Sequence, residues 1–180
     1  MKAWTNLALI PTPKRIKALP KDDRGYPVPF FASVIGGKPD FRVIDPVKWR
    51  ECVEQHRCSI CGKGLGKRIA FVGGPRSIEN RLFTDAPMHP ECATYALQAC
   101  PFMAAPKFGY HGDVAAVAAG EAKTISAVTT QRPERFGLGL TKGFRFARLN
   151  GSNDIVLQAA VFDSVSWWAY GQKVISDNNQ

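Results

Sequence analysis

The sequence predicts an α+β fold organised on a treble-clef zinc-binding unit, with flanking β-hairpins and short helices. Three observations lead to this prediction. Cys58 and Cys61 are separated by two residues, His89 and Cys92 are also separated by two residues, and the stretch between the pairs combines β-prone runs with glycine turns. A zinc knuckle, a hairpin, and a helix that supplies two ligands from its first turn together form a treble clef.

The two pairs have the residue types and spacing of a structural zinc site, which takes four Cys or His ligands in a tetrahedron. Gly62 follows the first pair, where backbone amides must fold toward the sulfur atoms. His89 and Cys92 share one face of a helix start, and the positive partial charge there favours a thiolate. Five cysteines, an odd number, favour metal over disulfides in a reducing compartment. We predict one structural Zn²⁺ bound by Cys58, Cys61, His89 and Cys92.

An enzymatic role for this metal is not expected. A catalytic zinc keeps one position open for water, whereas four protein ligands close the site. Glu91 lies between two ligands, but in zinc deaminases the Cys-x-x-Cys pair follows the His or Cys ligand. A nuclease of the His-Asn-His type needs further histidines, and His56 and His111 lie outside the unit. A metal-dependent nuclease or other enzyme is therefore the third function considered.

The chain divides into five segments by composition. They are an extended Pro/Lys-rich arm (1–29), the hairpin, helix and treble-clef unit (30–103), an Ala/Thr/Gly-rich linker or insertion (104–135), a C-terminal hairpin and short helix (136–171), and a tail (172–180). The insertion has few large apolar residues, and a short helix at 113–122 is the one element that we consider there.

Local signals place the elements before and within the zinc unit. Two β-prone runs flank Gly36-Gly37, which predicts a hairpin. Asp45 followed by Pro46 predicts the start of a helix that leads to Cys58. The treble-clef hairpin is expected to pair strands at 68–72 and 77–84, and a helix is expected from Pro90 to Pro101.

The C-terminal segment is expected to form a second hairpin and a helix. Residues 140–149 and 155–162 are β-prone and flank an Asn/Gly/Ser turn at 150–154. Asp163 is expected to cap a short helix at 164–170, which Gly171 ends.

The charge of the chain favours a polyanionic partner. The net charge is +9, and residues 1–57 carry eleven Lys/Arg against six Asp/Glu. Residues 132–148 carry five Lys/Arg against one Glu. Such a balance is typical of proteins that bind nucleic acid or an acidic protein surface, although a basic protein can also have no such partner.

Candidate binding residues lie in three of the predicted elements. A strand that alternates Phe144 and Phe146 with Arg145 can stack bases or contact phosphates, or can be an ordinary half-buried strand. Tyr26 either contacts a partner or pins the arm to the domain. The candidates for nucleic-acid or partner binding are Arg24, Tyr26, Arg76, Asn80, Arg81, Arg145 and Arg148. Cys52 and Cys100 are expected in packing roles.

The first function hypothesis is a zinc-stabilised protein that binds DNA or RNA. The alternative is a protein–protein interaction module or modulator of a host enzyme, which would use the proline-rich arm and the Ala/Thr-rich insertion for recognition. No apolar run approaches the roughly 20 residues that span a bilayer, and no small-x-small cleavage site follows the short apolar patch at the start. We therefore expect a cytoplasmic protein.

Several stretches resemble an uncharacterised family of small bacterial and phage-encoded proteins. The matching pieces include "LPKDDRGYPVPFF", "GKPDFRVID", "RCSICGKGLG", "IAFVGGP", "CPF" and, more weakly, "VSWWAYG". In the family pattern, Cys58, Cys61, His89 and Cys92 fall on the presumed zinc ligands. Because the family has no established activity, the resemblance implies the fold and the metal but no mechanism. The Ala/Thr-rich segment 110–131 replaces a shorter polar insert of the family. If the protein is phage-encoded, as the resemblance implies, we expect it in the host cytoplasm.

Overall fold

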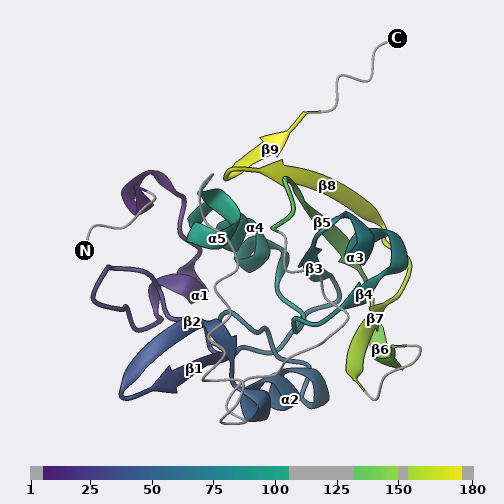
Figure 1. Cartoon of the computed structure of the whole chain (residues 1–180), viewed down its shortest axis with the longest axis horizontal. Helices are drawn as coiled ribbons and strands as arrows, with labels where there is room; N and C mark the ends of the chain where they lie inside the picture. Colours follow the sequence, from purple (N-terminus) through teal and green to yellow (C-terminus); the bar gives the residue numbers. More distant parts are fainter. Residues whose placement is uncertain (1–5, 106–131, 150–153, 176–180) are drawn as a thin grey trace.

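The structure is a computed structural model that describes residues 6–105, 132–149 and 154–175 (Figure 1). These residues form short helices and small antiparallel sheets, so the fold is α+β. The helices are η1 (Leu7–Leu9), α1 (Lys14–Lys17), α2 (Pro46–Glu54), α3 (Pro75–Asn80), α4 (Pro90–Ala99) and α5 (Pro101–Ala104). The strands are β1 (Ala32–Ile35), β2 (Lys38–Ile44), β3 (Ile69–Gly73), β4 (Leu82–Phe83), β5 (Phe136–Thr141), β6 (Phe144–Arg148), β7 (Ile155–Ala159), β8 (Ser164–Ala169) and β9 (Gln172–Val174).

The strands form three sheets. β1 pairs with β2, the second sheet has the order β3-β5-β8-β9, and the third has the order β4-β7-β6. In Figure 1 the β1–β2 hairpin and α2 lie on one side of the molecule, and the strands from β5 onward lie on the other. None of the helices in the described ranges is long and apolar enough to cross a membrane.

Strand β3 lies between the two hydrophobic cores. Its side chains alternate, so Ala70 and Val72 belong to the core around α4, while Ile69 and Phe71 belong to the core around α2 and β7. All four side chains are buried. Because both faces of β3 are covered, this strand couples the packing of the two cores.

The predictions for the β1–β2 hairpin and for α2 are confirmed. Gly36 and Gly37 have φ values of +56° and +79°, which is the left-handed backbone that a tight hairpin turn requires. The Asp45 carboxylate accepts hydrogen bonds from the amides of Val47 and Lys48, at 2.9 and 3.1 Å, and so caps α2. The hairpin predicted in the C-terminal segment is also present, as β6 and β7.

The strand predicted at 77–84 is wrong. Pro75 follows the extended Gly74 and begins helix α3, and only Leu82 and Phe83 form a strand. Pro at the first helical position favours a helix start, and this signal outweighs the β-propensity of Ile78. As a result β3 pairs with β5 and β4 pairs with β7, so no hairpin links the two halves of the zinc unit.

The helix predicted at 164–170 is also wrong, because these residues form β8, which pairs with β5 along its length. Alternate residues of β8 face opposite sides, and aromatic and β-branched residues favour a strand. Tyr170 and Gly171 both have positive φ values and turn the chain into β9, so residues 172–174 of the predicted tail are a strand.

Residues 6–29 contain η1 and α1 within the predicted extended arm, and Tyr26 is buried there with 3% exposure. The predicted helix at 113–122, most of the turn at 150–154, most of the insertion at 104–135 and residue His111 lie outside the described residues.

Close packing of helix α3 on strand β5 makes a testable prediction at Gly137. A Cβ atom there would collide with the side chain of Ile78 and would lie 3.2 Å from the ring of Trp167. We expect Gly137→Ala to lower the free energy of unfolding by about 1–3 kcal/mol, measured by urea denaturation. Gly143→Ala is the control, because no atom lies within 4 Å of a Cβ there. Equal stability of the two variants would contradict the packing of α3 on β5.

Candidate metal centre

The first half of the candidate site is the knuckle at Cys58–Cys61. The turn is closed by the amide of Gly62, which donates to the carbonyl of Cys58 at 2.8 Å, and by the amide of Cys58, which donates to Lys63 at 2.8 Å. Gly62 has φ of +68°, and a Cβ atom there would lie 2.8 Å from the ring of Phe30. Only glycine fits this turn without displacing Phe30.

The second half of the site is the start of helix α4. Met88 pairs with Ala70 of β3 through two backbone hydrogen bonds of 2.8 and 3.0 Å. His89 follows as the N-cap of α4, and Pro90 occupies the first turn of the helix. The bridge to β3 therefore fixes where α4 begins, and the first turn of α4 carries Cys92.

Ser59 holds the two halves together. Its amide donates to the carbonyl of Pro87 at 3.0 Å, and its hydroxyl donates to the carbonyl of Ala86 at 3.3 Å. On the outer side of the knuckle, the amides of Phe30 and Phe31 donate to the carbonyls of Ile60 and Ser59. The knuckle is thus enclosed between the segment before β1 and the segment before α4.

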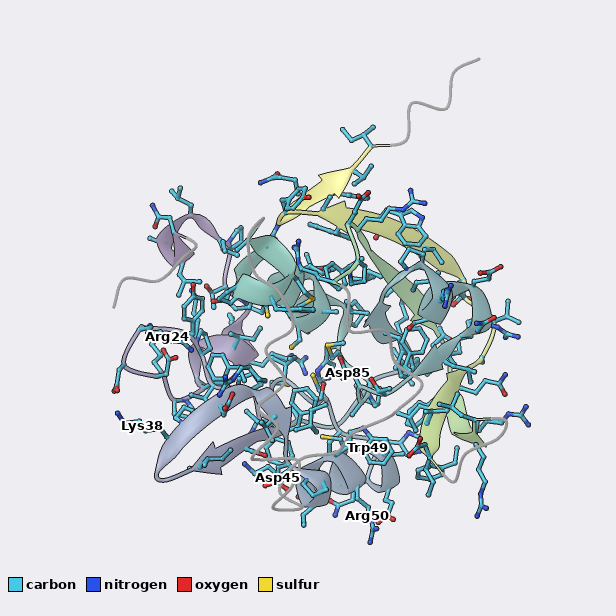
Figure 2. All side chains as sticks on the ribbon, viewed as in Figure 1. Arg24, Lys38, Asp45, Trp49, Arg50 and Asp85 are labelled. Atoms are coloured by element: carbon cyan, nitrogen blue, oxygen red, sulfur yellow. The ribbon has the colours of Figure 1, made fainter. Side chains whose placement is uncertain are left out.

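These contacts bring Cys58, Cys61, His89 and Cys92 into one cluster, with all four ligand atoms within 4.8 Å of one another. Each side chain is at most 5% exposed. His89 Nδ1 lies 3.4 Å from Cys61 Sγ, and the His89 amide donates to Cys58 Sγ at 3.4 Å. The buried Cys₃His group could hold one metal ion, as the spacing of the residues predicts. Sulfur atoms, yellow in Figure 2, gather near the middle of the view.

The outer nitrogen of His89 has a partner that orients the ring. Nε2 lies 2.9 Å from the carbonyl oxygen of Gly64, so a proton on Nε2 leaves Nδ1 free as the ligand atom. Nη1 of Arg15 also lies 2.9 Å from this nitrogen, but a guanidinium only donates and cannot hydrogen-bond to a protonated Nε2. Nε of Arg15 pairs with Glu91 at 3.0 Å. A divalent ion with three thiolates would carry one net negative charge, and Arg15 is a cation in contact with one of the candidate ligand residues. Glu91 is exposed and pairs with Arg15.

The three thiols of the cluster cannot all ionise unless a cation lies among them. Hydrogen bonding from the Cys58 thiol, and then from the Cys92 thiol, holds the pKa of Cys61 far below its usual range. Hydrogen bonding with Cys58, then with Cys61, and burial raise the pKa of Cys92 far above its usual range. Without a positive charge, one thiolate forms and suppresses ionisation of its neighbours. A divalent metal ion would stabilise all three thiolates together, so the donor set fits such an ion.

The remaining cysteines lie apart from this cluster. Cys52 is fully buried in the core around α2, as expected, and burial raises the pKa of its thiol to about 12. Cys100 is half-buried at the C-terminal end of α4.

Two predicted binding residues of the arm are engaged within the fold. Arg24 pairs with Asp22 at 2.7 Å and stacks over the rings of Tyr26 and Phe41, at 5.3 and 5.4 Å. Figure 2 shows Arg24 on the arm, away from α2. Tyr26 packs edge-on against Phe41, with 6.5 Å between ring centroids, and so pins the arm.

The other five predicted binding residues lie on α3 and β6. Arg76 and Asn80 are exposed on α3, not on the expected strand, and Arg81 is the C-cap of α3 with φ of +57°. On β6, Arg145 donates to Oε1 of Gln158 at 2.9 and 2.6 Å. Arg148 is exposed and, by the alternation of a strand, faces the opposite side of β6 from Arg145.

The sequence reasoning missed Arg15 and Gly64, which contact the outer nitrogen of His89. Arg15 is 74 residues from His89 in the chain, and no local pattern indicates that they meet. Gly64 lies in the glycine-rich turn after the knuckle, so the turn itself was the available signal.

Comparison of the chain with models of protein families, with characterised proteins and with solved structures finds no match. The resemblance to a family of small bacterial and phage-encoded proteins therefore stays a prediction. The fold and the site are interpreted from their own geometry.

The cluster predicts different outcomes for two equally buried cysteines. We expect Cys92→Ala to lose the bound metal and the cooperative unfolding transition, because structural metal sites contribute about 10 kcal/mol or more to folding. Cys52→Ala is the matched control, since Cys52 is also fully buried but lies outside the cluster. It is expected to retain one metal ion and to lose about 1 kcal/mol. Elemental analysis and thermal unfolding of both variants measure the difference, and metal retained by Cys92→Ala would contradict the ligand assignment.

Proposed function

We propose that Cys58, Cys61, His89 and Cys92 bind one structural Zn²⁺ ion and that the protein binds nucleic acid through its exposed basic surface. Three thiolates and one imidazole are the ligands of structural zinc. The knuckle followed by ligands at a helix start supports a treble-clef-like classification, in which α3 stands where the hairpin was expected. When bound, the zinc ion would join the knuckle to α4.

A structural role follows from the donor set. Four buried protein ligands would complete the tetrahedron of a structural zinc site, which would leave no position for a water molecule or a substrate. Burial of each ligand also keeps a substrate away from the ion. We therefore propose that the metal stabilises the fold and that the chain acts by binding, not by catalysis.

The observation that best supports nucleic-acid binding is a set of exposed basic side chains that form no ion pair within the described residues. Ion pairs between described residues involve the basic side chains of Arg15, Arg24, Arg42, Arg57 and Lys142. Exposed cations that pair with no acid in the described ranges include Lys63, Lys67 and Arg68 after the knuckle, Arg76 on α3, and Arg148 on β6. Uncompensated cations on a rigid fold favour phosphate contacts.

Binding through phosphates predicts a strong salt dependence. We expect fluorescence anisotropy with labelled single- and double-stranded DNA and RNA to show binding at about 50 mM salt that weakens steeply toward about 200 mM. About four phosphate contacts to a single strand correspond to a log–log slope of about −3. No binding at low salt, or binding with no salt dependence, would contradict the proposal and would favour an acidic protein partner for the same surface.

The backbone conformation of Arg81 allows its side chain to be removed, by substitution with glycine, without destabilising the fold. Its φ of +57° is a conformation that glycine adopts at less cost than arginine. We expect Arg81→Gly to unfold no more easily than the original chain and yet to bind nucleic acid about 2- to 10-fold more weakly, as loss of one phosphate contact implies. Unchanged affinity with unchanged stability would remove Arg81 from the binding surface.

A further inference from the structure

A groove lies between α2 and the β6–β7 hairpin, away from the metal ligands. It has a volume of about 460 Å³ and is lined by Trp49, Arg50 and Glu54 of α2 and by Phe146, Ala147, Arg148 and Ile155 of β6 and β7. Figure 2 shows Trp49 on the inner side of α2 and Arg50 on its outer side. A volume of this size falls within the range of small-ligand sites.

One face of β6 changes from core to solvent along its length. Phe144 packs against Phe71, with ring centroids 5.8 Å apart, and anchors the strand. Two residues on, Phe146 is 52% exposed, although its ring lies 6.4 Å from the ring of Trp49. Arg148 continues this face at the open end of the strand. The groove thus offers an accessible aromatic ring and a cation from the same strand.

The floor of the groove is held in place by a hydrogen bond. Trp49 is 6% exposed, and its indole nitrogen donates to the carbonyl of Thr84 at 2.8 Å, which holds the ring in place. Ile155, 44% exposed, adds an apolar edge. A rigid aromatic floor beside an exposed aromatic wall suits a flat, apolar-faced group better than a flexible chain.

The charges around the groove favour an anion attached to that flat group. Arg50 of α2 and Arg148 of β6 are exposed residues that line the groove, and neither forms an ion pair with a residue in the described ranges. Glu54 is the one acid among the lining residues. A nucleotide combines a planar base with a phosphate group, so it matches both the aromatic wall and the two guanidinium groups.

We propose that this groove binds an unpaired nucleotide of a single-stranded nucleic acid, with the base against Phe146 and the adjacent phosphates near Arg50 and Arg148. This inference rests on the proposed nucleic-acid binding and locates it. Bases within a duplex are stacked on one another, whereas single-stranded bases can stack on exposed aromatic side chains. The groove therefore selects single strands over duplexes.

The test compares three protein variants, each with one substitution in β6. Their binding to labelled single-stranded and duplex oligonucleotides of about 16 nucleotides is measured by fluorescence anisotropy at low salt. Phe146→Leu removes the aromatic face but keeps an apolar side chain. Arg148→Ala removes a cation from the groove. Arg145→Ala is the charge-matched control, because it removes a cation from the other face of β6, where Arg145 binds Gln158.

We expect Phe146→Leu to weaken single-strand binding by about 5- to 100-fold and to leave duplex binding within about twofold. Arg148→Ala should weaken single-strand binding more than Arg145→Ala does. Photo-crosslinking of a strand that carries 5-iodouracil, followed by mapping of the attached peptide, should place the crosslink on β6 or α2 of the original chain. This second measurement needs no variant to fold.

The outcomes separate the groove from the wider proposal. Salt-dependent binding that all three variants retain equally, or crosslinks that lie only on other elements, would overturn the groove and leave nucleic-acid binding in place. Absence of binding by the original chain to any of the oligonucleotides would overturn both. Capture of an acidic protein through the same groove, without nucleic-acid binding, would also contradict the proposal.

Discussion

The rest of the structure depends on the contact between the knuckle and the first turn of α4. Three thiols and an imidazole are buried within 4.8 Å of one another, where thiolates repel unless a cation lies among them. Around this cluster the chain makes its connections: Ser59 bonds to Pro87, and Met88 pairs with Ala70 of β3. Since whole domains are stable by about 5–15 kcal/mol, a metal site of about 10 kcal/mol decides whether this arrangement persists.

Strand β3 connects the packing around the cysteine cluster to the remainder of the fold. One face of β3 packs with the cysteine cluster and α4, and the other packs with α2 and β7. The groove between α2 and β6 is built on the second core, through Trp49 and Phe144. A metal ion bound by the cysteine cluster would therefore stabilise the proposed groove through β3 without contacting a molecule bound there. In the proposed function, this separation would let a closed metal site support a binding surface.

The sequence predicted those features whose signals are local. Paired ligands at fixed spacing identified the cluster, Gly36-Gly37 identified the first hairpin, and Asp45-Pro46 identified the start of α2. The two wrong elements have different causes. Residues 75–80 form a helix because Pro75 occupies its first turn, a local signal that outweighs the β-propensity of Ile78. Residues 164–169 form a strand because β5, which is distant in the chain, supplies an edge for them. The groove was missed because Trp49 and Phe146 lie in separate predicted elements and meet only through tertiary packing, which no local pattern indicates.

Zinc K-edge X-ray absorption of the purified full-length chain tests the central claim most directly, because it reports the atoms bound to the ion. A structural site with four protein ligands predicts one zinc ion with three sulfur neighbours at about 2.3 Å and one nitrogen neighbour at about 2.0–2.1 Å. A fifth or substituting oxygen neighbour from water, fewer than three sulfur neighbours, or absence of stoichiometric zinc would contradict it.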